Sequence, residues 1–250
     1  MRYTPEELMV VTGAREIRDG DNVLVGIGLP MACAILAKKT HAPRANIFFE
    51  NGVVNPESTD YGVGLADLKA WAGSSYFTGA VEVLGFMLQG GRIDVGFIGV
   101  LEVDMYGNAN SSLINAGGKL RHFTGSGGGN DIVSSARKVI VVTRHEKRKL
   151  PERVFFITSP GYVNGMDRAT LGIRGGDIIV ITNMAVLRFD KMKRRMTISS
   201  VHPGITVEEV IDNTGFPVEL PEKVASTPEP TDSELRILRE KIPKSLYARE

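Results

Sequence analysis

The sequence predicts an α/β fold: a single domain with a mostly parallel sheet flanked by helices. Segments with helical patterning alternate along the chain with short apolar runs, and the connections between them are short. This alternation is typical of a parallel sheet covered by helices. The chain has 250 residues, of which 42% are hydrophobic and 24% charged. A chain of this length can bury a substantial core in one large domain.

The first elements follow from capping signals and apolar runs. Thr4 can cap a helix, Pro5 suits its first turn, and Glu7 three residues after Thr4 completes a capping box. We expect this helix to run to about residues 19–20. The next elements are expected as a strand at 22–28, a helix at 30–40 that opens at a proline, and a strand at 46–50.

The same alternation continues through the rest of the chain. We expect a helix at 79–91, a short helix at 131–137, and strands at 93–100, 138–143, 153–158 and 177–182. Residues 185–201 alternate apolar and polar side chains on either side of a basic turn, which predicts a hairpin with a solvated tip. A capped helix follows at 206–216. We expect one domain over 1–222, and over 223–250 a linker and a C-terminal helix that packs on the same domain.

Composition excludes several classes of function. Lys and Arg number 30 and Asp and Glu 29, so no global field favours nucleic acid or a membrane surface. No apolar run approaches the ~18 residues of a membrane span, and the first residues do not resemble a secretory signal. Four scattered histidines and one cysteine give no metal-ligand spacing. The single Cys33, in an apolar stretch, reads as a buried structural thiol and fits a reducing cytoplasm.

The stretch ANIFFENGVV, residues 45–54, contains the first candidate for chemistry. Its apolar strand stops at Glu50, and Asn51-Gly52 then favours a tight turn. Open α/β sheets bind ligands outside the carboxyl ends of their strands. The Glu50 carboxylate is therefore either a group that points into a ligand crevice or a surface charge that ends a strand.

The stretch FTGSGGGND, residues 123–131, contains the second candidate. Four glycines stand just before a predicted short helix: Gly125, Gly127, Gly128 and Gly129. Such a loop can bring backbone N–H groups close to an anion, as in a phosphate cradle or an oxyanion hole, or it can be a flexible connector. It matches neither a P-loop nor a dinucleotide-binding fingerprint.

Two further stretches carry polar side chains. Residues 103–112 contain the turn formers Asp104, Asn108 and Asn110, for which a loop is the plain interpretation. His145 stands beside Glu146 and Lys147, and it is either a base or a solvated loop tip. Because no partner for it is visible in the sequence, the solvated tip is favoured.

Taken together and in order, these stretches resemble the β subunit of family I coenzyme A transferases, most closely of the glutaconate CoA-transferase type. The resemblance runs from about residue 5 to about residue 245. FENGVV is similar to the family's catalytic S-E-N-G segment. Other segments of the glutaconate-type β subunit, in the same order, are similar to the glycine loop, to residues 103–112, 144–165 and 206–216, and to the C-terminal helix. Phe49 replaces the family's Ser before the glutamate, and Asn51 stands where the glutaconate enzymes carry Ser.

The resemblance implies a covalent mechanism. Glu50 would attack an acyl-CoA to give an acyl-glutamyl anhydride, and the CoA thiolate would then form an enzyme thioester on the same carboxyl group. The resemblance implies an oxyanion and CoA site at Gly127, Gly128, Gly129 and Asn130, with Gly28, Asn51 and Asn108 lining the pocket. Coenzyme A would be a substrate, and neither a metal nor a resident cofactor is implied.

The resemblance also implies a partner. The family's α half typically carries a G-G-F-x-x-x-G-x-P signature, of which residues 26–32 show only an echo. A separate α subunit is therefore expected, in a heterotetramer or larger αβ assembly. The sequence does not identify the acyl group that is transferred. A dicarboxylate such as glutaconate would need a basic residue for its distal carboxylate, and Lys119, Arg121 and an arginine of the partner are all candidates.

Two alternatives remain open at this point. One is an acyl-CoA hydrolase or decarboxylase on the same scaffold, although relatives of that kind typically lack the nucleophilic glutamate. The other is a non-catalytic subunit that senses a small molecule, because the fold resembles sugar-phosphate sensing domains.

Overall fold

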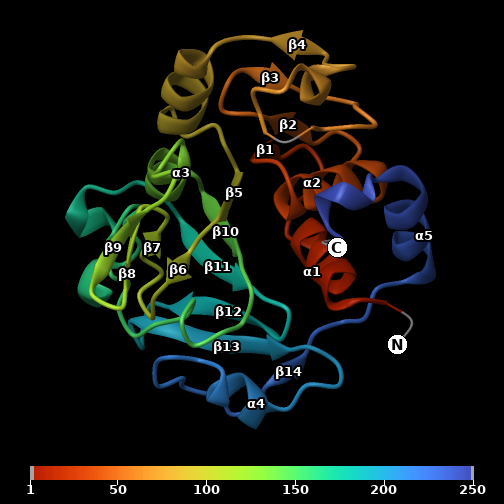
Figure 1. Ribbon diagram of the computed structural model, residues 1–250. Coiled ribbons are helices and arrows are strands. Elements are labelled where there is room, and N and C mark those ends of the chain that lie inside the picture. Colours follow the sequence, from red (N-terminus) through yellow and green to blue (C-terminus); the bar gives the residue numbers. More distant parts are fainter. Residues whose placement is uncertain (1–2, 63, 249–250) are drawn as a thin grey trace. The chain divides into compact units, whose positions relative to one another are not determined.

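The computed structural model describes residues 3–62 and 64–248, which form two compact units. The first unit consists of Met1–Ile98 and Glu229–Glu250, and the second of Gly99–Pro228. The expected α/β class is confirmed, because each unit contains helices and a parallel strand pairing extended by antiparallel strands (Figure 1). The predicted division at residues 222 and 223 stays a prediction.

The first unit contains a five-strand portion of sheet in the order β5-β1-β2-β3-β4. Strand β1 pairs in parallel with both β2 and β5, and β3 and β4 extend this arrangement antiparallel. The bounds are β1 (Asn22–Leu24), β2 (Asn46–Phe48), β3 (Val53–Val54), β4 (Tyr76–Phe77) and β5 (Val95–Gly99). Each predicted strand is present here, although shorter than expected.

Three helices of the first unit pack on one another. They are α1 (Pro5–Arg15), α2 (Leu29–Lys39) and α5 (Asp232–Lys241), and they lie side by side in Figure 1. The predicted capping box of α1 is confirmed: the Glu7 N–H donates to Thr4 Oγ1 (3.1 Å) and the Thr4 N–H to Glu7 Oε2 (2.9 Å). The α1 helix ends earlier than predicted, because the Glu16 N–H donates to the Gly13 carbonyl and tightens the last turn.

Two arginines fasten the C-terminal helix to α1. The guanidinium of Arg239 donates to both carboxylate oxygens of Glu7, at 2.7 and 2.8 Å, and that of Arg15 does the same with Glu234, at 2.9 and 2.8 Å. Bidentate pairs of this kind hold both distance and orientation. Cys33 on α2 is fully buried, which confirms its structural interpretation, and burial raises the pKa of its thiol.

The remaining helical segments of the first unit are short or unusual. Residues Val81–Gln89 form a wide π-helix, η2, near the position predicted for an ordinary helix. The Arg92 N–H donates to the Met87 carbonyl at 2.8 Å, five residues back. The two 3₁₀ segments are η1 (Leu68–Trp71) and η5 (Lys244–Leu246).

The second unit contains another five-strand portion of sheet, in the order β14-β13-β12-β11-β10. Strands β10 and β11 are parallel and largely buried, whereas β12 and β13 form the predicted hairpin. The bounds are β10 (Lys138–Val142), β11 (Asp177–Ile181), β12 (Ala185–Asp190), β13 (Arg195–Val201) and β14 (Ala225–Ser226). The predicted linker thus contributes the short strand β14.

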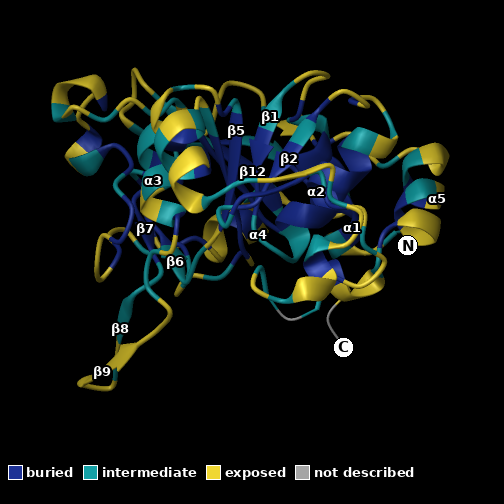
Figure 2. Ribbon diagram, turned by 90° about the horizontal axis from the view of Figure 1, so that it is seen from above, coloured by how far each residue is buried: buried dark blue, intermediate teal, exposed yellow. Residues whose placement is uncertain are grey.

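Smaller elements complete the second unit. Two small antiparallel pairs are β6 (Glu102–Val103) with β7 (Ala109–Asn110), and β8 (Leu113–Ala116) with β9 (Lys119–His122). Every residue of β9 is exposed, as its colour in Figure 2 shows. The helical segments are α3 (Gly129–Ser135), α4 (Val207–Asp212), η3 (Val163–Gly165) and η4 (Ala169–Leu171).

The strand predicted at 153–158 is wrong. This segment is irregular, and its backbone groups bond outside a ladder: the Phe155 N–H donates to Glu102 Oε2 (3.2 Å) and the Thr158 N–H to the Ala109 carbonyl (2.9 Å). The apolar side chains that suggested a buried strand are 43–50% exposed at residues 155–157. The residue types of this segment are common in strands, but here their apolar side chains belong to the surface and not to the core.

Candidate active site

Glu50 stands on a tight turn at the carboxyl end of β2. The preceding Phe49 is fully buried, while Glu50 is half-buried. The Phe49 N–H donates to the Val53 carbonyl (2.9 Å), and the Gly52 N–H donates to the Phe49 carbonyl (3.0 Å). A buried aromatic anchor and two backbone hydrogen bonds therefore fix the position from which the Glu50 side chain projects.

The two residues after Glu50 fasten the turn to its surroundings. Asn51 Nδ2 donates to the Leu65 carbonyl at 2.7 Å, and the Gly52 carbonyl accepts from the Thr78 N–H at 2.8 Å. Gly52 has φ of 100°, and a Cβ there would collide with the backbone of Thr78 and Gly79. Glycine is therefore required both by the backbone angle and by the close approach of another chain segment.

Gly28 lies at the same edge of the sheet as Glu50. It follows β1, the parallel neighbour of β2, and it begins α2 by accepting from the Ala32 N–H at 3.1 Å. Its φ of 97° favours glycine, and a Cβ there would meet only open space out to the Leu246 carbonyl at 3.9 Å. Gly28, Glu50 and Asn51 thus all follow the carboxyl ends of the paired strands β1 and β2 in the first unit, and there is open space beside Gly28.

The glycine loop lies in the second unit. Gly125 and Gly127 have φ of 84° and 49°, and Gly128 caps α3 with an ordinary φ of −75°. The Gly129 N–H donates to the Ser126 carbonyl (2.8 Å), and the Asn130 N–H to Ser126 Oγ (2.9 Å). These two donors are engaged inside the loop. An oxyanion role for residues 127–130 stays a prediction, and for Gly129 and Asn130 it would require that these bonds be exchanged.

Asn108 belongs to a buried polar network. Its side-chain amide donates to Asp104 Oδ2 (3.0 Å), and its Oδ1 accepts from the Gly161 N–H (2.9 Å). Asp104 Oδ1 also accepts from the Tyr106 and Asn108 N–H groups at 2.9 and 3.0 Å. Burial raises the pKa of Asp104, and these hydrogen bonds oppose the rise. The contacts account for Asn108 structurally, so its place in a substrate pocket stays a prediction.

The interpretation of His145 as a solvated loop tip is wrong. The imidazole is 4% exposed. Its Nδ1 lies 2.9 Å from Thr182 Oγ1 and its Nε2 2.9 Å from Thr214 Oγ1, so the ring links the ends of β10 and β11 to the segment after α4. Burial lowers the pKa of His145 to about 4, against a smaller opposing effect of the Val210 carbonyl. His145 is a structural residue of the second unit.

His145 makes the stability of the second unit sensitive to acid. The pKa of His145 is about 4 in the folded chain and 6.5 in the unfolded chain. Between these pH values the unfolded chain therefore binds a proton at His145 and the folded chain does not. The free energy of unfolding should therefore fall as pH drops through this window, by about 3 kcal/mol from this residue. We expect His145→Gln to be less stable at neutral pH but to lose less on acidification. Urea unfolding at about pH 7 and pH 4.5 measures both effects.

The exposed His122 supplies the matched control. His122→Gln should leave the pH dependence of unfolding at its wild-type value, because the substitution leaves His145 and its buried contacts in place. An equal acid sensitivity of the wild type and His145→Gln would show that other groups cause the loss.

The described part of the chain offers neither a metal site nor a membrane span. It contains no group of three His, Cys, Asp or Glu side chains placed to hold a metal ion. No helix within 3–62 or 64–248 is long and apolar enough to cross a bilayer.

The residues missed by sequence reasoning act through their backbones or from loops. Leu65 and Thr78 hold the Glu50 turn through carbonyl and N–H groups, which leave no signal in side-chain patterning. Arg168 is almost completely buried although it stands in a loop, where a charged residue is normally solvated.

Comparisons with known proteins identify relatives over most of the chain. The family model described as coenzyme A transferase matches residues 7–213. The chain is similar to the B subunit of 3-oxoadipate CoA-transferase from Pseudomonas knackmussii, with 36% identity over 95% of this chain and 92% of the relative. It is also similar to the B subunit of glutaconate CoA-transferase from Acidaminococcus fermentans, with 33% identity over 96% and 92% of the two chains.

A solved structure gives the same result in three dimensions. The crystal structure of glutaconate coenzyme A-transferase from Acidaminococcus fermentans matches with a TM-score of 0.86 and 30% sequence identity, over 99% of this chain and 98% of that one. Two relatives above 30% identity and a family model that covers most of the chain lead to one conclusion. This chain belongs to the coenzyme A transferase family.

Proposed function

We propose that this chain is the β subunit of a heteromeric CoA-transferase, which moves coenzyme A between an acyl-CoA and a carboxylic acid. The observation that carries the proposal is the Glu50 turn: a half-buried carboxylate on a rigid support at the carboxyl end of a parallel strand. The relatives named above are B subunits of enzymes that use 3-oxoadipate or glutaconate. By analogy the acceptor is a carboxylic acid, and dicarboxylates are the first candidates.

The proposed reaction proceeds through two covalent intermediates on Glu50. The carboxylate attacks the thioester carbonyl of the acyl-CoA, which gives an acyl-glutamyl anhydride and expels the CoA thiolate. The thiolate then attacks the glutamyl carbonyl, so that a glutamyl-CoA thioester forms and the first carboxylic acid leaves. The acceptor carboxylate repeats these steps in reverse. A carboxylate is a weak nucleophile, so the rigid turn contributes by holding it in the attacking orientation.

Both carbonyl additions develop negative charge on oxygen. We assign its stabilisation to backbone N–H groups of the loop 127–130 on the resemblance to the family alone, and Gly129 and Asn130 would first exchange the hydrogen bonds that they donate to Ser126. Gly28 and Asn51 serve the site by leaving space and by fixing the turn. Coenzyme A is a substrate in this scheme, and its steps need neither a metal ion nor a further cofactor.

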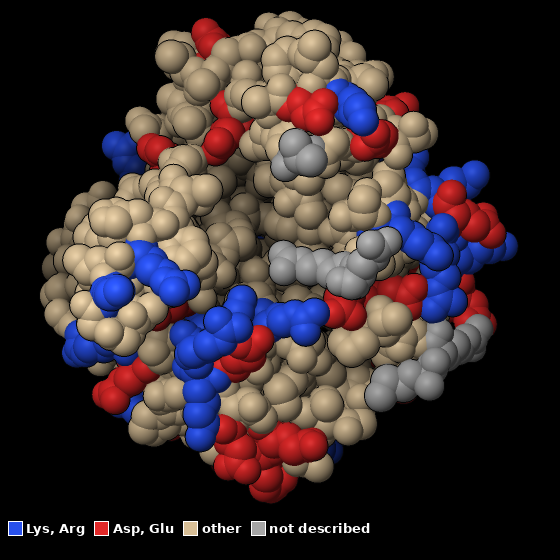
Figure 3. All heavy atoms as spheres, viewed as in Figure 1, with Lys and Arg blue, Asp and Glu red and all other residues tan. Residues whose placement is uncertain are grey.

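The proposed enzyme is cytoplasmic and contains a separate α subunit. Its single cysteine is buried and unpaired in a disulfide, as is usual for proteins of reducing compartments. On the face in Figure 3, basic and acidic side chains are interspersed, with acidic groups gathered over α4, so we propose no nucleic-acid partner. An αβ assembly of four or more chains follows from the family resemblance.

The chain alone should be inactive, because the α half of the site is missing. Large apolar side chains of the first unit agree with a surface that another chain covers: Leu68, Tyr76, Phe77, Val81 and Phe86 are 55–71% exposed. We expect CoA exchange between an acyl-CoA and a carboxylic acid only when the α subunit is co-expressed. Chromatographic separation of the acyl-CoA products measures the exchange, and light scattering measures assembly. Full activity from the isolated chain would contradict the proposal.

A further inference from the structure

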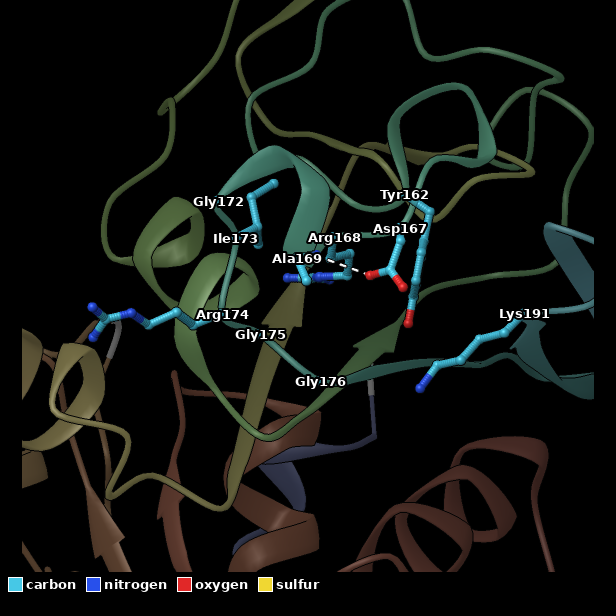
Figure 4. A pocket seen from close by; sticks show the side chains of 10 residues that line it. All are labelled: Tyr162, Asp167, Arg168, Ala169, Gly172, Ile173, Arg174, Gly175, Gly176 and Lys191. Atoms are coloured by element: carbon cyan, nitrogen blue, oxygen red, sulfur yellow. Dashed lines mark hydrogen bonds between the residues drawn. The ribbon is translucent and has the colours of Figure 1, made fainter.

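The second unit contains a cavity that the proposed transfer reaction does not use. It has a volume of about 500 Å³ and is lined by the loop from Tyr162 to Gly176 together with Lys191, which follows β12 (Figure 4). This volume lies within the ~300–1,000 Å³ typical of small-molecule sites. It is larger than a bare inorganic ion requires.

A buried arginine forms part of the cavity wall. Arg168 is 2% exposed, its Nη2 donates to the Val133 carbonyl, and its guanidinium carbon lies 5.5 Å from the centre of the Tyr162 ring. Its Nε and Nη1 are shielded from solvent and have no hydrogen-bond partner among the described residues. Buried guanidinium groups normally have their N–H groups satisfied. Most of the donors of Arg168 are therefore left without an acceptor.

The two nearby carboxylates already have partners. Asp167 Oδ1 accepts from the Ala169 N–H (2.9 Å), and Asp177 Oδ1 pairs with Lys191 Nζ (3.0 Å). Arg168 and Lys191 are thus matched in number by the carboxylates of Asp167 and Asp177, and Arg174 is a third basic residue of the lining. Figure 4 shows Arg174 pointing away from Arg168, so Arg168 and Lys191 are the two basic side chains that are candidates for binding a ligand.

The loop is shaped around the guanidinium. A Cβ at Gly175 would collide with Arg168 Nη2 and with the Val133 carbonyl. The Gly175 N–H donates to the Ser134 carbonyl (2.7 Å) and the Gly176 N–H to the Ala136 carbonyl (2.8 Å), which fixes the loop against the segment after α3. On the other side, Tyr162 stacks on Phe189 with ring centres 3.5 Å apart and holds the aromatic face that Arg168 covers. Arg168 thus packs between Gly175 and the Tyr162 ring and still lacks acceptors for Nε and Nη1.

We propose that this cavity, the Arg168 pocket, binds the phosphate or carboxylate group of a small organic molecule. Arg168 and Lys191 would recognise the oxyanion, with a small rotation of the Arg168 side chain toward the cavity that it lines. An oxyanion supplies the acceptors that Nε and Nη1 lack, and charge-assisted hydrogen bonds of this type are the strongest available to a guanidinium. The proposal does not depend on Glu50.

Isothermal titration calorimetry on the full 250-residue chain tests the pocket with three probes: adenosine 5′-monophosphate, succinate and orthophosphate. Binding of the nucleotide at one site per chain, with orthophosphate as a competitor, identifies a phosphate ester. Binding of succinate without the nucleotide identifies a carboxylate. We expect Lys191→Gln to lower the affinity for the bound probe by about tenfold, because one charge-assisted contact is lost. Raising the salt concentration should weaken it as well.

The same turn offers a matched control. Lys193 also pairs with a carboxylate, Glu219 at 3.4 Å, but does not line the cavity, so Lys193→Gln should change the affinity less than about twofold. Arg168→Lys should bind more weakly still, and if circular dichroism shows that it does not fold, Lys191→Gln decides alone. Failure of both organic probes to bind would overturn the proposal. So would a probe that binds the wild type and Lys191→Gln equally, because it occupies another site.

Discussion

Replacement of Glu50 by glutamine should lower CoA transfer by at least about 10⁴-fold, the scale on which enzymes lose activity when a covalent nucleophile is removed. Glutamine is nearly isosteric, and the Glu50 side chain is only half-buried, so the turn and the fold should persist. An amide carries no negative charge and does not form the anhydride. Steady-state rates of the αβ enzyme, with thermal unfolding of the same samples, separate loss of chemistry from loss of structure.

A trapping experiment identifies the intermediate itself. Incubation with an acyl-CoA in the absence of an acceptor acid should leave CoA attached to Glu50 through a thioester. Borohydride reduces a thioester but spares a free carboxylate, so it should inactivate the enzyme only after acyl-CoA has been added. Mass spectrometry of peptides should then place the reduced residue within 45–58.

A neighbouring carboxylate supplies the control. Glu57 lies exposed in the segment after β3, so Glu57→Gln should retain both activity and trapping. Label on Cys33 or on the partner chain would contradict the proposed mechanism. A Glu50→Gln enzyme that exchanged CoA at the wild-type rate would reduce Glu50 to a charged residue that ends a strand.

The parts of the fold that sequence predicted are those that local chemistry determines. Thr4 and Glu7 form their capping box within three residues of each other, and the same box recurs at Thr206 and Thr231. Buried parallel strands such as β10 appear as continuous apolar runs, because both of their faces are covered. These signals need no knowledge of distant contacts.

The errors come from contacts between distant segments. Residues 155–157 have the composition of a buried strand but lie on the surface, because the adjoining backbone bonds to residues about 50 positions earlier. His145 stands among charged residues, yet its partners are 37 and 69 residues away in sequence. The polarity of the neighbouring residues therefore predicted burial for residues 155–157 and exposure for His145, and both predictions were wrong.

The candidate site shows the same division. The position of Glu50 followed from an apolar run that ends at a tight turn, and the structure places it on such a turn. The buried Arg168 escaped notice because its cavity is assembled by a loop whose glycines fold over it. Adjacent residues determine a turn, so the sequence predicts it. A cavity depends on how segments that are distant in sequence pack around it.

Gly52→Ala should cause the second large effect, because it disturbs the support of Glu50 without touching the carboxylate. Alanine at φ of 100° is strained, and its Cβ would collide with the Thr78 carbonyl and the Gly79 nitrogen. Backbone strain and overpacking together should cost about 3 kcal/mol of stability. If the turn moves to relieve the collision, Glu50 shifts as well, and a displacement of about 1 Å can lower turnover by about 100-fold.

Gly20→Ala separates strain from collision. Gly20 has a similar φ of 89°, but a Cβ there would meet nothing within 4 Å. Its substitution should cost only the strain of a positive φ, about 1 kcal/mol, and leave turnover unchanged. Urea unfolding, and turnover of the αβ enzyme at a temperature where both variants are folded, measure the two effects. If Gly52→Ala matched Gly20→Ala in stability and kept the wild-type turnover, then close packing against Thr78 would not be what holds the Glu50 carboxylate in place.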